Sequence, residues 1–140
     1  MPSSIVIDTS AVIHYLTDRT ILGQAARDFL RKNTHMLIAP PLFLAETEST
    51  LNLLRLNKQL NQKELRLART LWEAMQIEII HLPETHATAR EIADNLRLPR
   101  VYDATFAALA MLRGVDYYTA DLAFYNAAKR KYPFVRIIGN

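Results

Sequence analysis

The chain has 140 residues, half of them hydrophobic, and this predicts one compact domain over residues 1–140 with its own core. The absence of cysteine excludes disulfides, thiolate zinc sites and cysteine nucleophiles, and it fits a reducing cytoplasm, where we expect this protein. The net charge of +3 is a mild bias toward polyanions, and we expect neither a signal peptide nor a membrane-spanning segment.

Short apolar runs alternate with helical periodicity along the chain. The runs that predict strands are residues 5–7, 36–39, 77–82, 117–119 and 135–138. A short first helix is predicted to begin at Ser10, which can cap it. Helical periodicity predicts six further helices at residues 25–31, 44–56, 62–75, 84–96, 101–113 and 121–131. This alternation predicts an α/β fold with a mainly parallel sheet, whose ligand site lies beyond the carboxyl ends of the strands.

Four acidic side chains interrupt apolar stretches at or near the starts of predicted helices, namely Asp8, Glu46, Asp103 and Asp121. Asp8 and Asp121 follow predicted strands, and the other two are close enough to the same sheet edge to reach it. A carboxylate beside a core is costly unless it is paired, hydrogen-bonded or bound to a metal. We interpret the four as a shared cation site, although each alone also fits a structural acid at a helix start.

The ordered set of acids and their flanking residues resembles the PIN domain family, in particular its small VapC-type toxin ribonucleases. The stretches that carry the resemblance are Ile7-Asp8-Thr9-Ser10, Leu44-Ala45-Glu46, Tyr102-Asp103-Ala104 and Thr119-Ala120-Asp121. The resemblance covers nearly the whole chain. It implies a PIN-like three-layer α/β/α sandwich with a mainly parallel central sheet.

The resemblance also implies a Mg²⁺- or Mn²⁺-dependent endoribonuclease. Its implied catalytic residues are Asp8, Glu46, Asp103 and Asp121, with the metal held by Asp8, Asp103 and Asp121. Ser10 and Thr119 are implied to support this pocket. Such an ion prefers oxygen ligands and activates water for attack on a phosphate. The implied partners are an RNA substrate, a cognate antitoxin protein and a second copy of the chain.

Other residues give weaker indications. Arg97 and Arg100 flank Pro99 shortly before Asp103, where they are candidates for binding RNA phosphates. A surface role is an equally good interpretation of both arginines. The four histidines are scattered, without a pair at i and i+4, which argues against a zinc site.

An apolar stripe along the helices predicted at residues 44–56 and 62–75 predicts self-association. Its members are Leu51, Leu54, Leu65, Ala68, Leu71 and Met75. We expect this stripe to be too apolar for a solvated surface, and therefore to form a homodimer contact.

Four other functions are alternatives to a toxin ribonuclease. A haloacid-dehalogenase-like phosphatase needs a second aspartate two residues after the first, where this chain has Ser10. A response-regulator receiver needs paired early acids and a late lysine after a strand, and neither is convincing here. A non-toxin PIN nuclease or a non-catalytic PIN-like RNA-binding module stays open as the alternative.

Overall fold

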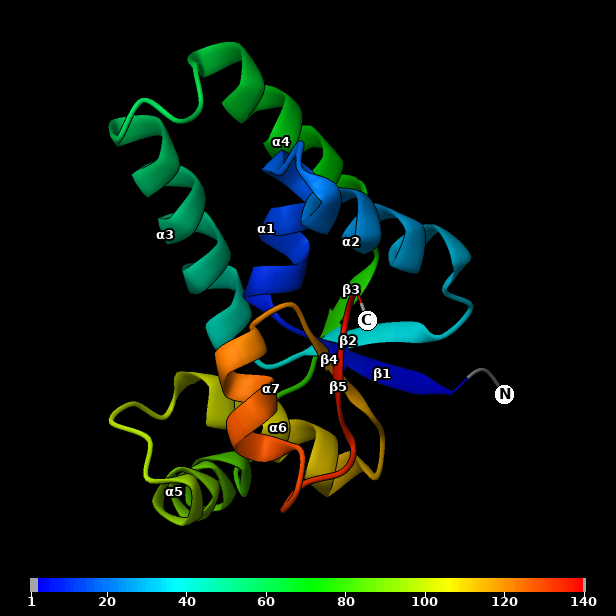
Figure 1. Cartoon of the computed structure of the whole chain (residues 1–140), viewed down its shortest axis with the longest axis vertical. Helices are drawn as coiled ribbons and strands as arrows, with labels where there is room; N and C mark the ends of the chain where they lie inside the picture. The colour runs from blue at the N-terminus through cyan, green and yellow to red at the C-terminus, as the bar shows by residue number, and fades with distance from the viewer. Residues whose placement is uncertain (1–2, 140) are drawn as a thin grey trace.

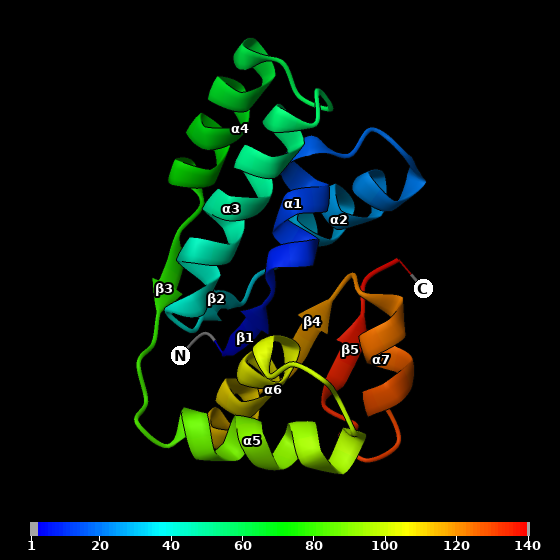
Figure 2. The same cartoon turned by 90° about the vertical axis from the view of Figure 1, so that its left-hand side faces the viewer.

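The centre of the molecule is a five-stranded sheet in which every neighbouring pair of strands is parallel. The computed structural model describes residues 3–139. The strands lie at the centre of the molecule (Figure 1) and are β1 (Ser4–Ile7), β2 (Met36–Ala39), β3 (Ile77–Ile79), β4 (Tyr117–Thr119) and β5 (Val135–Ile137). Their spatial order is β3-β2-β1-β4-β5 (Figure 2). The chain runs outward from β1 to β3 and then returns to the other side of β1. The crevice at this reversal, between β1 and β4, is where parallel α/β sheets bind ligands.

Helices cover both faces of the sheet. They are α1 (Thr9–Thr17), α2 (Ile21–Lys32), α3 (Leu42–Leu56), α4 (Gln62–Ala74), α5 (Thr85–Leu96), α6 (Tyr102–Arg113) and α7 (Leu122–Ala128). Figure 2 shows α1 to α4 on one side of the sheet, α5 and α6 on the other, and α7 beside β5. The predicted three-layer α/β/α sandwich is therefore confirmed, with a sheet that is wholly rather than mainly parallel. No helix within the described residues is long and apolar enough to cross a bilayer.

The main core lies between β1, β4 and the alanine-rich helix α6. β1 is buried from Ile5 to Ile7, as expected for a central parallel strand covered on both faces. Helix α6 buries Ala104, Phe106, Ala107, Ala108, Leu109 and Ala110. Its small side chains let the helix backbone come close to the sheet, and Gly114 ends it in the left-handed conformation (φ 66°).

A second core lies between α3, α4 and α1, away from the sheet. It buries Leu51, Leu60, Leu65 and Ala68, with Ile13, Leu16, Leu54 and Trp72 packed around them. Most of the apolar stripe that we expected at a dimer contact therefore faces the molecule's own interior. The inference of an exposed stripe was wrong, because α1 supplies a partner surface that the periodicity of α3 and α4 does not show. The exposed leucines of this helix pair are Leu44, Leu53, Leu56, Leu67 and Leu71.

Several element boundaries differ from the prediction for local reasons. Asp8, not Ser10, caps α1, because its carboxylate accepts the Ala11 N–H. Helix α2 begins at Ile21 rather than at residue 25, and a side chain at Gly23 would clash with the Asp18 carbonyl oxygen, 2.0 Å from where its Cβ would lie. Strand β3 has three residues, and α7 ends at Ala128.

The second core gives a matched pair of substitutions on one helix. Leu65→Ala removes a buried side chain (1% exposed) and should lower the free energy of unfolding by about 2–5 kcal/mol. Leu67→Ala, at a position 61% exposed, should change it by less than about 0.5 kcal/mol. Urea unfolding of both variants measures the difference. Equal effects would contradict the assignment of Leu65 to a second core.

Candidate active site

The carboxylate of Asp8 lies where β1 ends and α1 begins, and it accepts four hydrogen bonds. Oδ1 accepts from the Ser10 hydroxyl (2.8 Å) and the Ala11 N–H (3.0 Å). Oδ2 accepts from the hydroxyls of Tyr117 (2.8 Å) and Thr119 (2.5 Å). A carboxylate offers about four lone-pair sites, so the donors of the protein occupy all of them. This explains how a carboxyl group that is only 2% exposed is accommodated in the core.

The two short hydroxyl side chains connect Asp8 to the backbone beyond β4. Ser10 Oγ accepts from the Ala120 N–H (3.2 Å), and Thr119 Oγ1 accepts from the Asp121 N–H (3.0 Å). Each hydroxyl therefore donates to Asp8 and accepts from the turn that begins α7. The expected supporting residues Ser10 and Thr119 thus lie directly against the first acid.

The other three acids come from three different helices. Glu46 lies near the start of α3 and accepts from the Thr9 hydroxyl (3.0 Å). Asp103 lies in the first turn of α6. Asp121 caps α7, with Oδ1 accepting the Phe124 N–H (3.0 Å). All four acids therefore arrive at the carboxyl end of the sheet, from elements that are far apart in the sequence.

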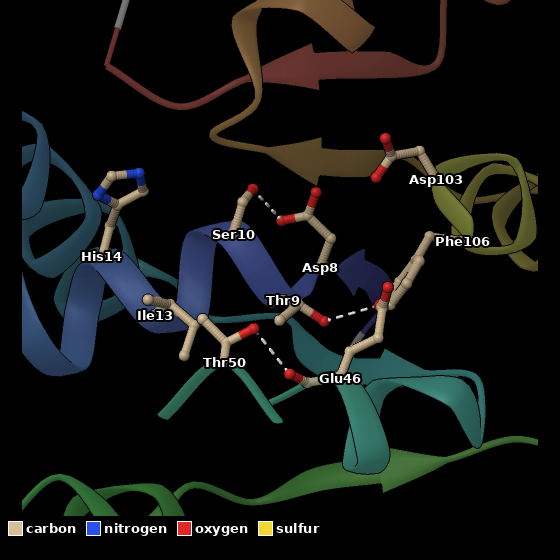
Figure 3. Close-up of a pocket in the computed structure, with 9 residues that line it drawn as sticks. All are labelled: Asp8, Thr9, Ser10, Ile13, His14, Glu46, Thr50, Asp103 and Phe106. Carbon is tan, nitrogen blue, oxygen red and sulfur yellow. Dashed lines mark hydrogen bonds between the residues drawn. The ribbon is translucent and has the colours of Figure 1, made fainter. Parts of the chain in front are cut away.

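Three of the acids line one hollow of about 360 Å³. Figure 3 shows Asp8 at the start of α1, Asp103 on α6 and Glu46 on α3 around this space. Asp121 is not among the lining residues, yet it lies close enough for its charge to act on Asp103. The hollow also has Thr9, Ser10, Ile13, His14, Thr50 and Phe106 in its walls.

The charges of the four acids act on one another. Burial, reinforced by the charges of Asp8, Asp121 and Glu46, raises the pKa of Asp103 to about 7. Burial also raises the pKa of Asp8, against the opposing effect of its four hydrogen bonds. The pKa of Glu46 is raised as well, by burial first and then by the charge of Asp8. The four carboxylates are therefore stabilised when they bind either protons or a cation.

The donor set fits a hard divalent cation. All candidate ligands are carboxylate oxygens, which Mg²⁺ and Mn²⁺ prefer. Within residues 3–139, no three His, Cys, Asp or Glu side chains converge closely enough to hold an ion by themselves. Mg²⁺ needs no such convergence, because it is commonly held by one or two carboxylates together with waters and a substrate phosphate. Asp8 can become a ligand only when one of its hydroxyl donors turns away.

The two candidate arginines have different surroundings. Arg100 lines a second hollow of about 390 Å³, which shares Glu46 and Asp103 with the first and also contains Tyr102. Arg97 ends α5 in the left-handed conformation (φ 54°) and is absent from the walls of both hollows. Of the two arginines, only Arg100 therefore lines a hollow together with the acids Glu46 and Asp103.

Three polar residues of this region were not singled out from the sequence. Thr9 holds Glu46, Tyr117 holds Asp8, and His14 lines the hollow. The alternation of a strand places Tyr117 on the same face as Thr119, and helical spacing places His14 one turn after Ser10. These two periodicities could have indicated Tyr117 and His14 from the sequence, but a tyrosine in a buried strand is also typical of an ordinary core residue.

Comparison with known proteins identifies the family. Residues 5–130 match the family model described as PIN domain. The fold is similar to VapC20 of Mycobacterium tuberculosis, described as a sarcin-ricin loop cleaving toxin, with a TM-score of 0.63 at 18% identity over 88% of this chain and 94% of that one. It is also similar to PAE2754 of Pyrobaculum aerophilum, with a TM-score of 0.61 at 18% identity over 91% and 87% of the two chains. No curated protein matches the chain. At this identity the two solved structures show a shared fold.

The raised pKa of Asp103 predicts how stability depends on pH without metal. Between its unfolded value of 3.8 and its folded value of about 7, the folded protein keeps a proton that the unfolded chain has lost. Raising the pH through this window should therefore lower the free energy of unfolding, and the loss should level off above pH 7. Asp103→Asn should reduce the loss, whereas Asp94→Asn, at an exposed position of α5, should not. Urea unfolding in EDTA at pH 5 and pH 8 measures this, and identical pH profiles for wild type and Asp103→Asn would contradict it.

Proposed function

The chain belongs to the PIN domain family, and we propose on this basis that it is a nuclease, specifically a metal-dependent endoribonuclease that acts as the toxin of a type II toxin–antitoxin pair. The observation that carries this proposal is the hollow lined by Asp8, Glu46 and Asp103 beside the crevice between β1 and β4, with Asp121 close enough for its charge to act on Asp103. A hollow lined by such acids repels RNA phosphates unless a cation is present. The site therefore suits phosphodiester hydrolysis that depends on a divalent ion.

We propose that Asp8, Asp103 and Asp121 would bind the ion, Mg²⁺ or Mn²⁺. When bound, this ion offsets the negative charge of the phosphate and eases deprotonation of the attacking water. Asp8 stays oriented by its remaining donors when one hydroxyl turns away to let the ion bind, and Ser10 and Thr119 also fix the turn before α7.

Glu46 has a different role in this proposal. Thr9 orients its carboxylate, and burial raises its pKa toward the operating pH. A base whose pKa lies nearer to the operating pH is better matched to proton transfer. We therefore assign Glu46 to accept a proton from the attacking water. Arg100, in the adjoining hollow, is assigned to a neighbouring phosphate of the RNA.

The biological role rests on the likeness to a toxin fold. VapC20 is described as a toxin that cleaves the sarcin-ricin loop, and its fold covers most of this chain. We propose that a cytoplasmic antitoxin binds this protein and inserts an arginine or lysine among the carboxylates. We keep the homodimer as part of the proposal, since the family resemblance implies it independently of the buried stripe.

The first test is cleavage of RNA by the purified protein. Cleavage should require Mg²⁺ or Mn²⁺ and leave 5′-phosphate and 3′-hydroxyl ends, because a water nucleophile does not use the RNA 2′-hydroxyl. Glu46→Gln and Asp103→Asn should each reduce the rate at least about 100-fold, the usual size of a lost catalytic group. Glu48→Gln, two residues away on the exposed side of α3, is the control and should cleave normally. Full activity in EDTA, or products with 2′,3′-cyclic phosphates, would rule out this mechanism.

The second test is induced expression in bacteria, comparing wild type with Asp8→Asn. The variant should stay folded, because its amide oxygen can accept from Ala11 and the hydroxyls around it can turn to accept from its NH₂ group. Wild type should arrest growth, the variant should not, and sequencing of RNA ends should locate the cleaved RNA. If neither arrests growth although purified wild type cleaves RNA, a non-toxin PIN nuclease is the better assignment.

A further inference from the structure

A histidine–aspartate pair lies at the rim of the acidic hollow. His14 is one helical turn after Ser10 on α1 and lines the same hollow as Asp8, Glu46 and Asp103. Figure 3 shows its imidazole on the same face of α1 as Ser10. The side chain is 28% exposed, so it is accessible from the hollow without being freely solvated.

The orientation of this ring is fixed by Asp18. His14 Nδ1 lies 2.5 Å from Asp18 Oδ2. Asp18 is anchored in turn, because its Oδ1 accepts the Thr20 N–H (2.7 Å) and its backbone carbonyl accepts from Arg27 (2.7 Å). Nδ1 is therefore committed to a carboxylate, and Nε2 is the ring nitrogen that can meet a ligand.

Resting on the proposed endoribonuclease function, we propose that His14 Nε2 binds the ribose 2′-hydroxyl of a nucleotide next to the cleaved phosphate and so favours RNA over DNA. With Nδ1 facing Asp18, Nε2 is the nitrogen that a ligand can meet. A 2′-hydroxyl can both donate and accept a hydrogen bond, so it suits this nitrogen. The hydroxyl also adds no negative charge beside Asp8, Glu46 and Asp103. The 2′-hydroxyl is the group by which a protein distinguishes RNA from DNA.

A purely structural role for the pair makes a different prediction. His14 lies in the last turn of α1, where its interaction with Asp18 and with the helix dipole stabilises the helix end. In that case, removing the imidazole lowers stability and affects RNA and DNA substrates alike. The two interpretations are separated by varying the side chain and the substrate hydroxyl together.

The experiment is a double-mutant cycle between protein and substrate. One single-stranded RNA oligonucleotide is compared with copies that carry a single 2′-deoxynucleotide, moved stepwise across the cleaved bond. Wild type should lose about two- to tenfold in cleavage rate at one position, the size of one neutral hydrogen bond. His14→Ala should show the same loss on the all-ribose RNA and no further loss on that deoxy copy. His14→Ala slowing both substrates by the same factor would overturn the proposal.

Two further variants sharpen the result. Asp18→Asn keeps an oxygen for the Thr20 N–H but turns an NH₂ donor toward Nδ1, so the ring loses its carboxylate acceptor and the variant should lose part of the discrimination between the two substrates. His86→Ala, an exposed histidine on α5, should keep the wild-type ratio. Thermal unfolding of each variant shows that it is folded. A wild-type ratio in both His14→Ala and Asp18→Asn would overturn the assignment.

Failure of the proposed function can be distinguished from failure of this inference. If wild type cleaves no RNA in Mg²⁺ or Mn²⁺, the nuclease proposal fails and the oligonucleotides stay intact. Their binding is then measured by fluorescence anisotropy with the same substrates and variants. A loss of affinity at one deoxy position that disappears in His14→Ala supports the contact, and equal affinity of wild type for all substrates refutes it.

Discussion

The carboxylate of Asp8 is the constraint on which the other features of this site depend. A buried carboxyl group is tolerated only where donors satisfy its lone pairs, and here two donors come from α1 and two from β4. The same bonds connect the end of β1 to the end of β4 across the point where the strand order reverses. The bonds that make the acid compatible with the core therefore also define the crevice beside it.

From this position the electrostatics of the site follow. Glu46 and Asp103 arrive from helices on opposite sides of the sheet, and Asp121 arrives from the turn that Thr119 and Ser10 hold. Burial, reinforced by the charges of Asp8, Asp121 and Glu46, raises the pKa of Asp103 to about 7, so ionisation of the whole group is opposed. The fold tolerates this cost because a cation or protons relieve it, which is why such a cluster is typical of a functional site.

The sequence predicted the layers of the fold and the location of the acids well, because both depend on periodicity and on strand ends. It predicted the surface of α3 and α4 badly. A helical stripe shows that a face is apolar, but it does not show whether another part of the same chain covers it, as α1 does for Leu51 and Leu65. Tyr117 was missed for a related reason. Its ring packs between Phe106 and Phe124 like any core aromatic residue, and only the three-dimensional structure shows where its hydroxyl points.

The second core connects stability with the geometry of the site. Helix α3 carries Leu51 on the face that packs in this core, and Glu46 and Thr50 in the wall of the hollow. The distance between Glu46 and the acids on the other side of the hollow is therefore set by how α3 packs against α4 and α1. Since packed interiors resist deformation, leucines far from the acids hold one wall of the hollow in place. The small core away from the sheet thus has a positional role as well as a stabilising one, because it fixes the only acid of the group that reaches the hollow from α3.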